Sequence, residues 1–271
     1  MSAYRNLALR ILITLFAAGA GACGGGGHFG GGFLGDGGGT DDGGSGAKAG
    51  FVALSDQTTT TFAYAYFAPP ATDTHCTSVT SGACSIEMCT HTGADGGAAP
   101  GTFPNPGMIQ LAGGLSPVSL SPAADGSYAT ETLPMRVWNG GEMLKAAALG
   151  ATVPLFSVTL NAPFPAVVKM PDMLPIMANR TIDLPLQWSG GIGTVLRAYL
   201  TSAAQPDAPI VCDFPVSANQ ATIPATLMER LPPGPATLQA LVVARANVVS
   251  GDWTITFRVD TPATMLAVQL Q

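Results

Sequence analysis

The sequence predicts an all-β protein: an antiparallel β-sandwich, built as two packed β domains behind a disordered, glycine-rich tether. Three observations lead to this prediction. Apolar and polar residues alternate with period two along most of the chain after residue 50, which is typical of half-buried strands. Breaks that contain glycine or proline, such as 113–114 and 232–234, separate these runs at short intervals. Helical periodicity is nearly absent, so the body of the chain belongs to the all-β class.

Residues 1–22 are predicted to be a signal peptide. Arg5 and Arg10 precede an apolar run from Ile11 to Ala22 that ends in small residues, which is the order of features in a secretory signal. As a helix this run would extend roughly 18 Å, well short of the ~30 Å hydrocarbon core of a bilayer. A membrane-spanning helix is therefore the weaker interpretation, and we expect the mature chain to be exported.

The segment Ala20-Gly21-Ala22-Cys23 resembles the lipobox of bacterial lipoproteins, in which small residues precede a cysteine that is acylated and becomes the new N-terminus. The resemblance implies a lipid anchor at Cys23, with the membrane as a partner, and two or more acyl chains anchor a protein stably. It departs from the usual pattern at Ala20, where leucine is commonest. In that family an aspartate directly after the cysteine favours retention in the inner membrane. Gly24 stands at this position here, so the resemblance implies the outer membrane. The alternative is an ordinary signal peptide cut near Ala22, which leaves a soluble secreted protein with a free Cys23.

Residues 23–50 are predicted to be the lipidated cysteine and the tether. More than half of residues 24–50 are glycine, and such a composition cannot bury enough apolar surface to offset the entropy of ordering. The flexible coil would span on the order of 30 Å. After it, a proline-rich stretch near residue 163 is the expected junction between a β domain at 51–162, which contains a cysteine-rich loop, and a second β domain at 163–271.

The mature chain is predicted to be acidic. Without Arg5 and Arg10, nine basic residues face 17 acidic ones, which gives a net charge of −8 against −6 for the whole chain. An acidic, lysine-poor surface argues against nucleic acid as a partner and against electrostatic docking on anionic lipid. Proteins and polysaccharides of the cell envelope remain as candidate partners.

Four cysteines in the body indicate two disulfides, because an even number in an exported protein is typical of a disulfide framework. They are Cys76, Cys84, Cys89 and Cys212. Of the three connectivities we favour Cys76–Cys89, which would close about fourteen residues, together with Cys84–Cys212, which would link the two halves. The alternative is a zinc site in which His75 and His91 join the first three cysteines. The spacing lacks a C-x-x-C pair, however, and an oxidising compartment favours disulfides.

Alternating runs give the strand predictions. The clearest of them cover 58–66, 181–188 and 252–259. Residues 142–149 contain good helix formers but also alternate, and we predict a strand there. One short helical turn is expected within 222–231, where Pro224 stands near the start and Leu227 and Leu231 are four residues apart.

The aromatic stripe Phe62, Tyr64 and Tyr66 has two interpretations. On an exposed sheet face it could stack on sugar rings or on the apolar surface of a partner. More often such a stripe is the core-facing side of a strand, and that is the prediction here. The same prediction applies to the tryptophans at positions 138, 188 and 253.

The region after residue 163 resembles an immunoglobulin-like sandwich. About a hundred residues carry some seven strand signals, with Trp188 near the start, although the Cys–Trp–Cys spacing of antibody domains is missing. Most of the chain also resembles exported lipoproteins of myxobacterial type, through the loop Gly82-Ala83-Cys84 to Cys89 and the strand Ile210-Val211-Cys212-Asp213-Phe214. These motifs are structural, and the resemblance implies no activity.

No hydrolase, metalloprotease or nucleotide-binding motif accompanies the three histidines. His28 lies in the tether, and His75 and His91 flank the cysteine loop, where loop histidines are most simply solvated. We therefore predict a non-enzymatic binding or interaction module of the cell envelope, without a cofactor. The alternatives are a structural envelope lipoprotein that has no ligand, and a hydrolase in which a loop histidine is held against Asp95 or Glu87.

Overall fold

The computed structural model describes residues 48–68, 76–89, 103–169 and 175–271. The predicted signal peptide, Cys23 and the three histidines lie outside the described residues, as does the tether up to residue 47. Strand β1 (Lys48–Asp56) begins inside the last part of the predicted tether. The described part is mostly β, as predicted, and its strands form three sheets.

Most of the strands that follow β1 alternate buried and exposed residues over at least part of their length, which is why the period-two pattern located most of them. They are β2 (Thr61–Ala68), β3 (Cys76–Ser81), β4 (Cys84–Cys89), β5 (Ile109–Ala112), β6 (Val118–Leu120), β7 (Glu131–Leu133), β8 (Met143–Ala148), β9 (Phe156–Asn161), β10 (Phe164–Lys169), β11 (Ile176–Ala178), β12 (Leu184–Ile192), β13 (Val195–Ser202), β14 (Gln205–Pro215), β15 (Gln220–Ile223), β16 (Gly234–Ser250), β17 (Trp253–Asp260) and β18 (Thr264–Leu270). Two short helical segments, η1 (Val216–Ala218) and α2 (Ala225–Met228), flank β15.

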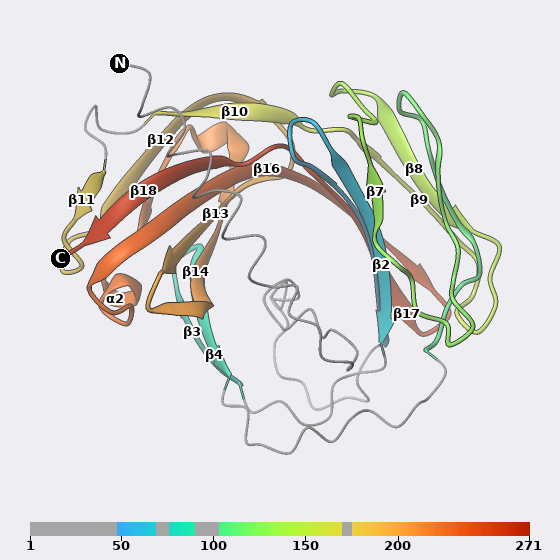
Figure 1. Cartoon of the computed structure of the whole chain (residues 1–271), viewed down its shortest axis with the longest axis horizontal. Helices are drawn as coiled ribbons and strands as arrows, with labels where there is room; N and C mark the ends of the chain where they lie inside the picture. The colour runs from blue at the N-terminus through green and yellow to red at the C-terminus, as the bar shows by residue number, and fades with distance from the viewer. Residues whose placement is uncertain (1–47, 69–75, 90–102, 170–174) are drawn as a thin grey trace. The chain divides into compact units, whose positions relative to one another are not determined.

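The largest sheet has 11 strands, in the order β3-β4-β14-β13-β16-β17-β1-β2-β7, with β18 paired to β16 and β11 paired to β18. In Figure 1, the long strands β16 and β17 connect the β13–β14 side of this sheet to the β2–β7 side. The strand pairs are antiparallel, as predicted, except for β1–β17 and β11–β18, which are parallel. The first described strand therefore pairs with one of the last.

Two smaller sheets pack on one side of the large sheet and enclose two separate cores. The four-stranded sheet β6-β5-β8-β9 packs onto β1, β2 and β17, and the three-stranded sheet β10-β12-β15 packs onto β13, β14, β16 and β18 (Figure 1). The first core includes Leu54, Phe67, Trp138, Phe156 and Phe257, and the second includes Trp188, Leu200, Ile210, Leu227 and Leu238. The described part of the chain is thus a pair of two-layered sandwiches that share one sheet.

Strand β16, which is 17 residues long, belongs to both sandwiches. Leu238 and Val242 pack in the second core, Ala244 packs in the first, and Ala246 and Val248 lie against that first core. These positions are all separated by even numbers of residues, so one face of a single strand serves both cores. Along one edge, the first part of β16 pairs with β18 and the later part pairs with β17.

Several local predictions are confirmed. Residues 143–148 form a strand, in which Leu144, Ala146 and Ala148 are buried. The helical turn α2 begins after Pro224 and buries Leu227. All three tryptophans are buried. The run predicted from residue 181 begins later, at β12, because Thr181 lies in a turn that the Asn179 side chain closes by accepting a hydrogen bond from the Thr181 N–H, at 3.0 Å.

Both cores draw on chain from either side of residue 163. Strand β4, which precedes that position, contributes Ile86 to the second core, and β17, which follows it, contributes Ile255 to the first. A division at residue 163 would therefore cut through both cores.

Candidate functional site

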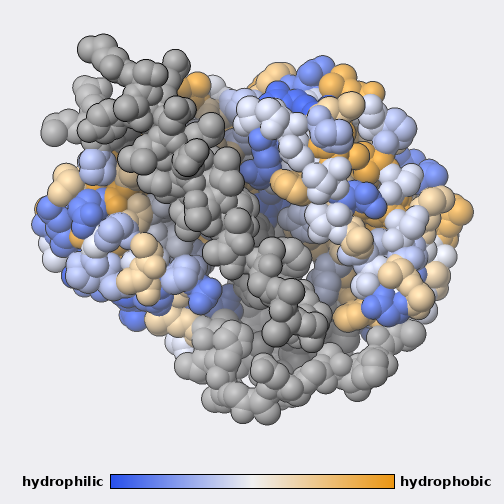
Figure 2. Space-filling model, viewed as in Figure 1, coloured by the Kyte–Doolittle hydropathy of each residue, from blue (hydrophilic) through white to orange (hydrophobic). Residues whose placement is uncertain are grey.

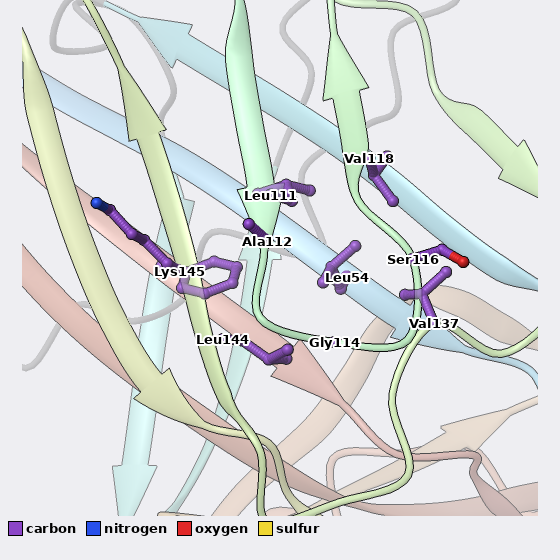
Figure 3. A pocket seen from close by; sticks show the side chains of 10 residues that line it. Leu54, Leu111, Ala112, Gly114, Ser116, Val118, Val137, Leu144 and Lys145 are labelled. Atoms are coloured by element: carbon purple, nitrogen blue, oxygen red, sulfur yellow. The ribbon is translucent and has the colours of Figure 1, made fainter.

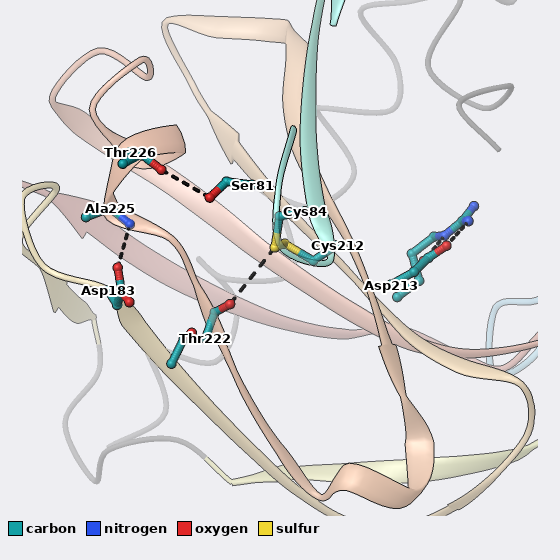
Figure 4. Close-up of a disulfide and its surroundings, with 9 residues drawn as sticks. Ser81, Cys84, Asp183, Cys212, Asp213, Thr222, Ala225 and Thr226 are labelled. Atoms are coloured by element: carbon teal, nitrogen blue, oxygen red, sulfur yellow. Dashed lines mark hydrogen bonds and ion pairs between the residues drawn. A yellow bond between two sulfur atoms is a disulfide. The ribbon is translucent and has the colours of Figure 1, made fainter. Parts of the chain in front are cut away.

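A disulfide between Cys84 and Cys212 joins β4 to β14, as favoured from the sequence. The two cysteines are register partners in the adjacent strands, with a Cα–Cα distance of 4.0 Å, and both are buried in the second core (Figure 4). Cys76 and Cys89 also stand opposite each other in the register of the β3–β4 hairpin. Their side chains lie outside the described residues, so the second disulfide stays a prediction, as does its zinc alternative.

The side of the large sheet that faces away from both cores carries a group of charged and phenolic side chains. Figure 4 shows how this arises on β14, where Cys212 turns toward Cys84 while Asp213, the next residue, carries an ion pair on the other side of the strand. We call this group the charged face. Its members are Tyr64 on β2, Arg197 and Tyr199 on β13, Asp213 on β14, Arg245 on β16, and Arg258 and Asp260 on β17.

The aromatic stripe lies on this same side, and the prediction that it faces a core is wrong. Ala63 and Ala65 point into the first core, while Tyr64 is half-buried and Tyr66 is 46% exposed. The physical reason is packing: on the inward side of β2, Phe67 already meets Phe156 of the opposite layer, with 6.4 Å between the ring centroids, and only the small Ala63 and Ala65 accompany it. Alternation in a sequence separates two faces of a strand but does not say which face is buried.

Arg197 and Asp213 form a two-point ion pair on the charged face. Arg197 donates from Nε to Oδ1 and from Nη2 to Oδ2 of Asp213, both at 2.6 Å, in the two-point geometry that guanidinium and carboxylate groups favour. Nη1 of Arg245 lies 3.8 Å from Oδ2 of the same carboxylate. One aspartate thus holds two arginines from two other strands.

Arg258 and Asp260 form a second pair, and this one is buried almost completely. The two residues are 1% and 3% exposed, and Arg258 donates from Nε to Oδ1 of Asp260 at 2.7 Å. Nη1 and Nη2 of Arg258 are buried and have no hydrogen-bond partner among the described residues, and the same is true of the Tyr199 hydroxyl. Buried donors without a partner cost about 1–3 kcal/mol each, so they are rare in folded proteins and call for an explanation.

The electrostatics of the charged face follow from this burial. Burial raises the pKa of Asp260, and the Arg258 guanidinium opposes that shift by favouring the carboxylate. Burial, together with the charge of Asp260, raises the pKa of Tyr64 to about 12. Arg197 and Arg258 are almost completely buried and Asp213 and Arg245 are partly buried, so most charges of this group are poorly solvated.

Strand register places Tyr64 in the same row of the sheet as two arginines of the charged face. Arg245, Arg258, Ala53 and Tyr64 are successive partners across β16, β17, β1 and β2, and they form one row of the sheet. Ala53, which is fully buried, stands between Arg258 and Tyr64 in this row. Tyr66 lies two residues along β2, in the next row on the same side.

The two cavities found in the described part of the chain have fewer charged and polar side chains than the charged face. One, between the two layers of the first sandwich, has a volume of about 10 Å³ and is lined mainly by apolar residues such as Leu54, Val118 and Leu144 (Figure 3). It holds no more than about one water molecule. The second is an open hollow of about 370 Å³ beside β12 and η1, lined by Gly190–Gly193 and Val216 with two short polar residues, and it contains no charged side chain.

Two further observations on the described residues concern metal ions and membrane-spanning helices. No group of three or more histidine, cysteine, aspartate or glutamate side chains among them is arranged to hold a metal ion. No helix in this part of the chain is long and apolar enough to cross a membrane. On the face seen in Figure 2, polar and apolar residues are interspersed over the coloured surface.

Sequence reasoning missed the charged face. Arg258 lies within the predicted strand at 252–259 and was given no role of its own, and Arg197, Asp213 and Arg245 were not among the candidate site residues. The available signal was a charged residue in the middle of a β-rich run in which charges are scarce, on strands that the sheet brings together from distant parts of the chain.

Comparisons with known proteins identify no family. No protein-family model matches the chain, and no curated protein matches it. Among solved structures, the crystal structure of a tetra-tandem repeat in the extending region of a large adhesion protein is 12% identical, with a TM-score of 0.22, and the match covers 81% of this chain and 74% of that chain. A likeness with so low a score carries no argument, and the geometry of the charged face is the basis for inference about function.

Proposed function

We propose that the chain is a non-enzymatic binding module, exported and held at the cell envelope by a lipid on Cys23, whose ligand is an envelope polysaccharide. The observation that carries the proposal is the charged face with Tyr64 and Tyr66 beside it. It lies on the side of the large sheet that neither smaller sheet covers, and it offers flat aromatic rings next to cationic donors. Rings of this kind supply contact area at low entropic cost, and the polar groups fix orientation.

Two observations support export and anchoring. The Cys84–Cys212 disulfide suits an oxidising compartment, because thiols are kept reduced in the cytosol. The small residues before Cys23, after a basic and apolar leader, suit lipidation, and Gly24 in place of an aspartate suits the outer membrane.

The test is a binding experiment with the full chain, solubilised in detergent, with its disulfides intact. The immobilised protein is offered purified cell-surface polysaccharides and, separately, detergent-solubilised envelope proteins. We expect one polysaccharide to be retained, and Tyr66→Ala to weaken its retention about tenfold, through the loss of an exposed ring worth on the order of 1 kcal/mol. Met143→Ala is the matched control, because Met143 is also a large exposed residue, at 64% exposure, but lies on the four-stranded sheet.

Three results would count against the proposal. Retention that Tyr66→Ala leaves unchanged would exclude this face as the site. Retention of an envelope protein alone would replace the polysaccharide with a protein partner. If the folded chain retained nothing, a structural envelope lipoprotein would be the better description.

A further inference from the structure

We infer that one end of the first sandwich inserts into the neutral lipid of the bilayer to which Cys23 is anchored. This docking adds an orientation of the body to the proposed function, and it rests on the lipid anchor proposed there. We call this end the docking tip, and its segments are 106–108, 149–155 and 249–252. In Figure 1 it is the end toward which the arrow of β2 points, since the end of β2 pairs with the start of β1.

The three most exposed large apolar side chains of the described residues all belong to the docking tip. Leu149 is 92% exposed, Val249 73% and Leu155 68%. The segments that carry them are adjacent, because the Ser250 hydroxyl donates to the Leu155 carbonyl at 2.6 Å. Single exposed apolar residues are ordinary, but such residues gathered at one place on a surface mark a binding surface.

The loop between β8 and β9 is held firmly while it exposes these side chains. The Asn105 carbonyl accepts a hydrogen bond from the Val153 N–H at 3.0 Å, and the Asn105 N–H donates to the Thr152 hydroxyl at 2.7 Å. Val153, in the middle of the loop, is fully buried in the first core. Leu149 and Leu155, at the two ends of the loop, therefore stay exposed without any loosening of the fold.

The predicted tether enters the body at the docking tip. Lys48, the first residue of β1, is the register partner of Trp253, and its Nζ lies 2.6 Å from Oδ2 of Asp252. Residues 24–47 separate Cys23 from this point. Because β1 is nine residues long, or about 30 Å, contact through the opposite end would use roughly the whole r.m.s. span of the tether. The docking tip is thus the end that the anchor brings to the bilayer.

The charges at the docking tip favour neutral lipid. Lys48 and Asp252 neutralise each other, and Asp125 in an adjacent turn adds one acidic charge. Segments 106–108 and 149–155 contain no charged residue. Such a surface gives no attraction to anionic lipid, so burial of apolar area is the driving force.

This contact is weak by itself. The side chains of Leu149, Leu155 and Val249 hold less hydrocarbon than one myristoyl chain, which alone holds a protein on a membrane only marginally. The acyl chains on Cys23 therefore supply the affinity, and the docking tip sets the orientation.

The test measures the depth of the docking tip in phosphatidylcholine vesicles that hold the full chain by its anchor. Leu149→Trp places an indole at the tip. Met143→Trp is the matched control, because Met143 is 64% exposed and begins the strand β8 that Leu149 follows, roughly 20 Å away. We expect brominated phosphatidylcholine to quench the added emission of Leu149→Trp at least about twofold, with a blue shift, because interfacial segments lie ~5–10 Å deep. Met143→Trp should show neither effect.

Two charges added at the docking tip should prevent insertion. Leu155→Asp with Val249→Asp, in the Leu149→Trp chain, should abolish the quenching while the melting temperature stays the same, because both positions are exposed.

Four results would overturn the inference. Equal quenching of Leu149→Trp and Met143→Trp, or quenching of neither, in a chain that stays on the vesicles would remove the docking tip and leave the anchor intact. Quenching that needs anionic lipid and disappears in salt would replace the apolar contact with an electrostatic one. Self-association of the wild type in solution, lost in the double aspartate variant, would assign the docking tip to a second copy of the chain. A chain that does not bind the vesicles would overturn the anchor as well.

Discussion

Arg197 on β13 and Asp213 on β14 are register partners that share two hydrogen bonds of 2.6 Å, and this pair connects the charged face to the strand that carries the disulfide. Arg197 is buried, so the loss of this two-point carboxylate contact would weaken the compensation of a desolvated charge. We expect Asp213→Asn to lower the free energy of unfolding by about 3 kcal/mol, measured by chemical denaturation. Asp252→Asn is the control, since the Lys48–Asp252 pair is as short, at 2.6 Å, but exposed. A similar loss in both variants would contradict the argument from burial.

The disulfide should contribute strongly to stability, because it links residues 128 positions apart. The double variant Cys84→Ser/Cys212→Ser should lose about 4 kcal/mol of unfolding free energy, mainly because the unfolded chain is no longer restricted. The variant Cys76→Ser/Cys89→Ser should lose less, since any link between these two closes a much shorter loop. Thiol labelling of the denatured, unreduced protein should find none of these four cysteines free, and two labelled sites per chain would refute the second disulfide.

Tyr64 should make the protein sensitive to alkaline pH. Its pKa is about 12 in the folded state and about 10 when unfolded, so between pH 10 and 12 the unfolded chain loses a proton that the folded chain keeps. Stability is therefore full below pH 10 and falls as the pH rises toward 12, by about 2 kcal/mol from this residue. Tyr64→Phe should reduce the fall, as followed by denaturation at successive pH values. A fall of unchanged size would show that the folded protein does not protect this phenol.

Gly113 should tolerate no side chain. Its φ of +96° disfavours other residues, and an added Cβ would lie 2.0 Å from the Met143 carbonyl oxygen on the paired strand β8. Gly113→Ala should cost about 4 kcal/mol or more, because backbone would have to move. Gly82, with a φ of +59° and nothing within 4 Å of its Cβ position, is the matched control, and Gly82→Ala should cost only about 1 kcal/mol. Equal effects in a melting experiment would contradict the steric explanation.

The proposed anchor is tested by Cys23→Ala. Without the thiol no acyl chain can be attached, so the variant should move from the membrane fraction to the soluble fraction while its body stays folded. Metabolic labelling with a fatty acid should mark the wild type and not the variant. Unchanged partitioning would refute the lipid anchor.

Local structure could be predicted from the sequence, because it depends on alternation and turn residues within a short window. The strand at 143–148 and the turn after Pro224 are examples. The aromatic stripe could not be oriented, because the choice between Tyr64 and Ala63 as the inward residue depends on the volume of side chains in the opposite layer.

The charged face could not be predicted for a different reason. Arg197, Asp213, Arg245 and Arg258 lie on four strands, and only the strand order of the sheet brings them together. Each is a single polar position in its own strand, where a solvated side chain is the usual outcome. The Cys84–Cys212 pair could be predicted, because cysteines in an exported chain are expected to form disulfides with distant partners. Arginines give no comparable indication of their partners.

The parallel pairing of β1 with β17 governs when the protein can fold. In a chain that emerges N-terminus first, Lys48 appears long before Trp253, yet these two are neighbours in the finished sheet. Until β17 is available, the β1–β2 hairpin has an open edge, and contacts of such long sequence separation form slowly. The large sheet therefore closes only once β17 pairs with β1, and that late pairing becomes the step that completes folding.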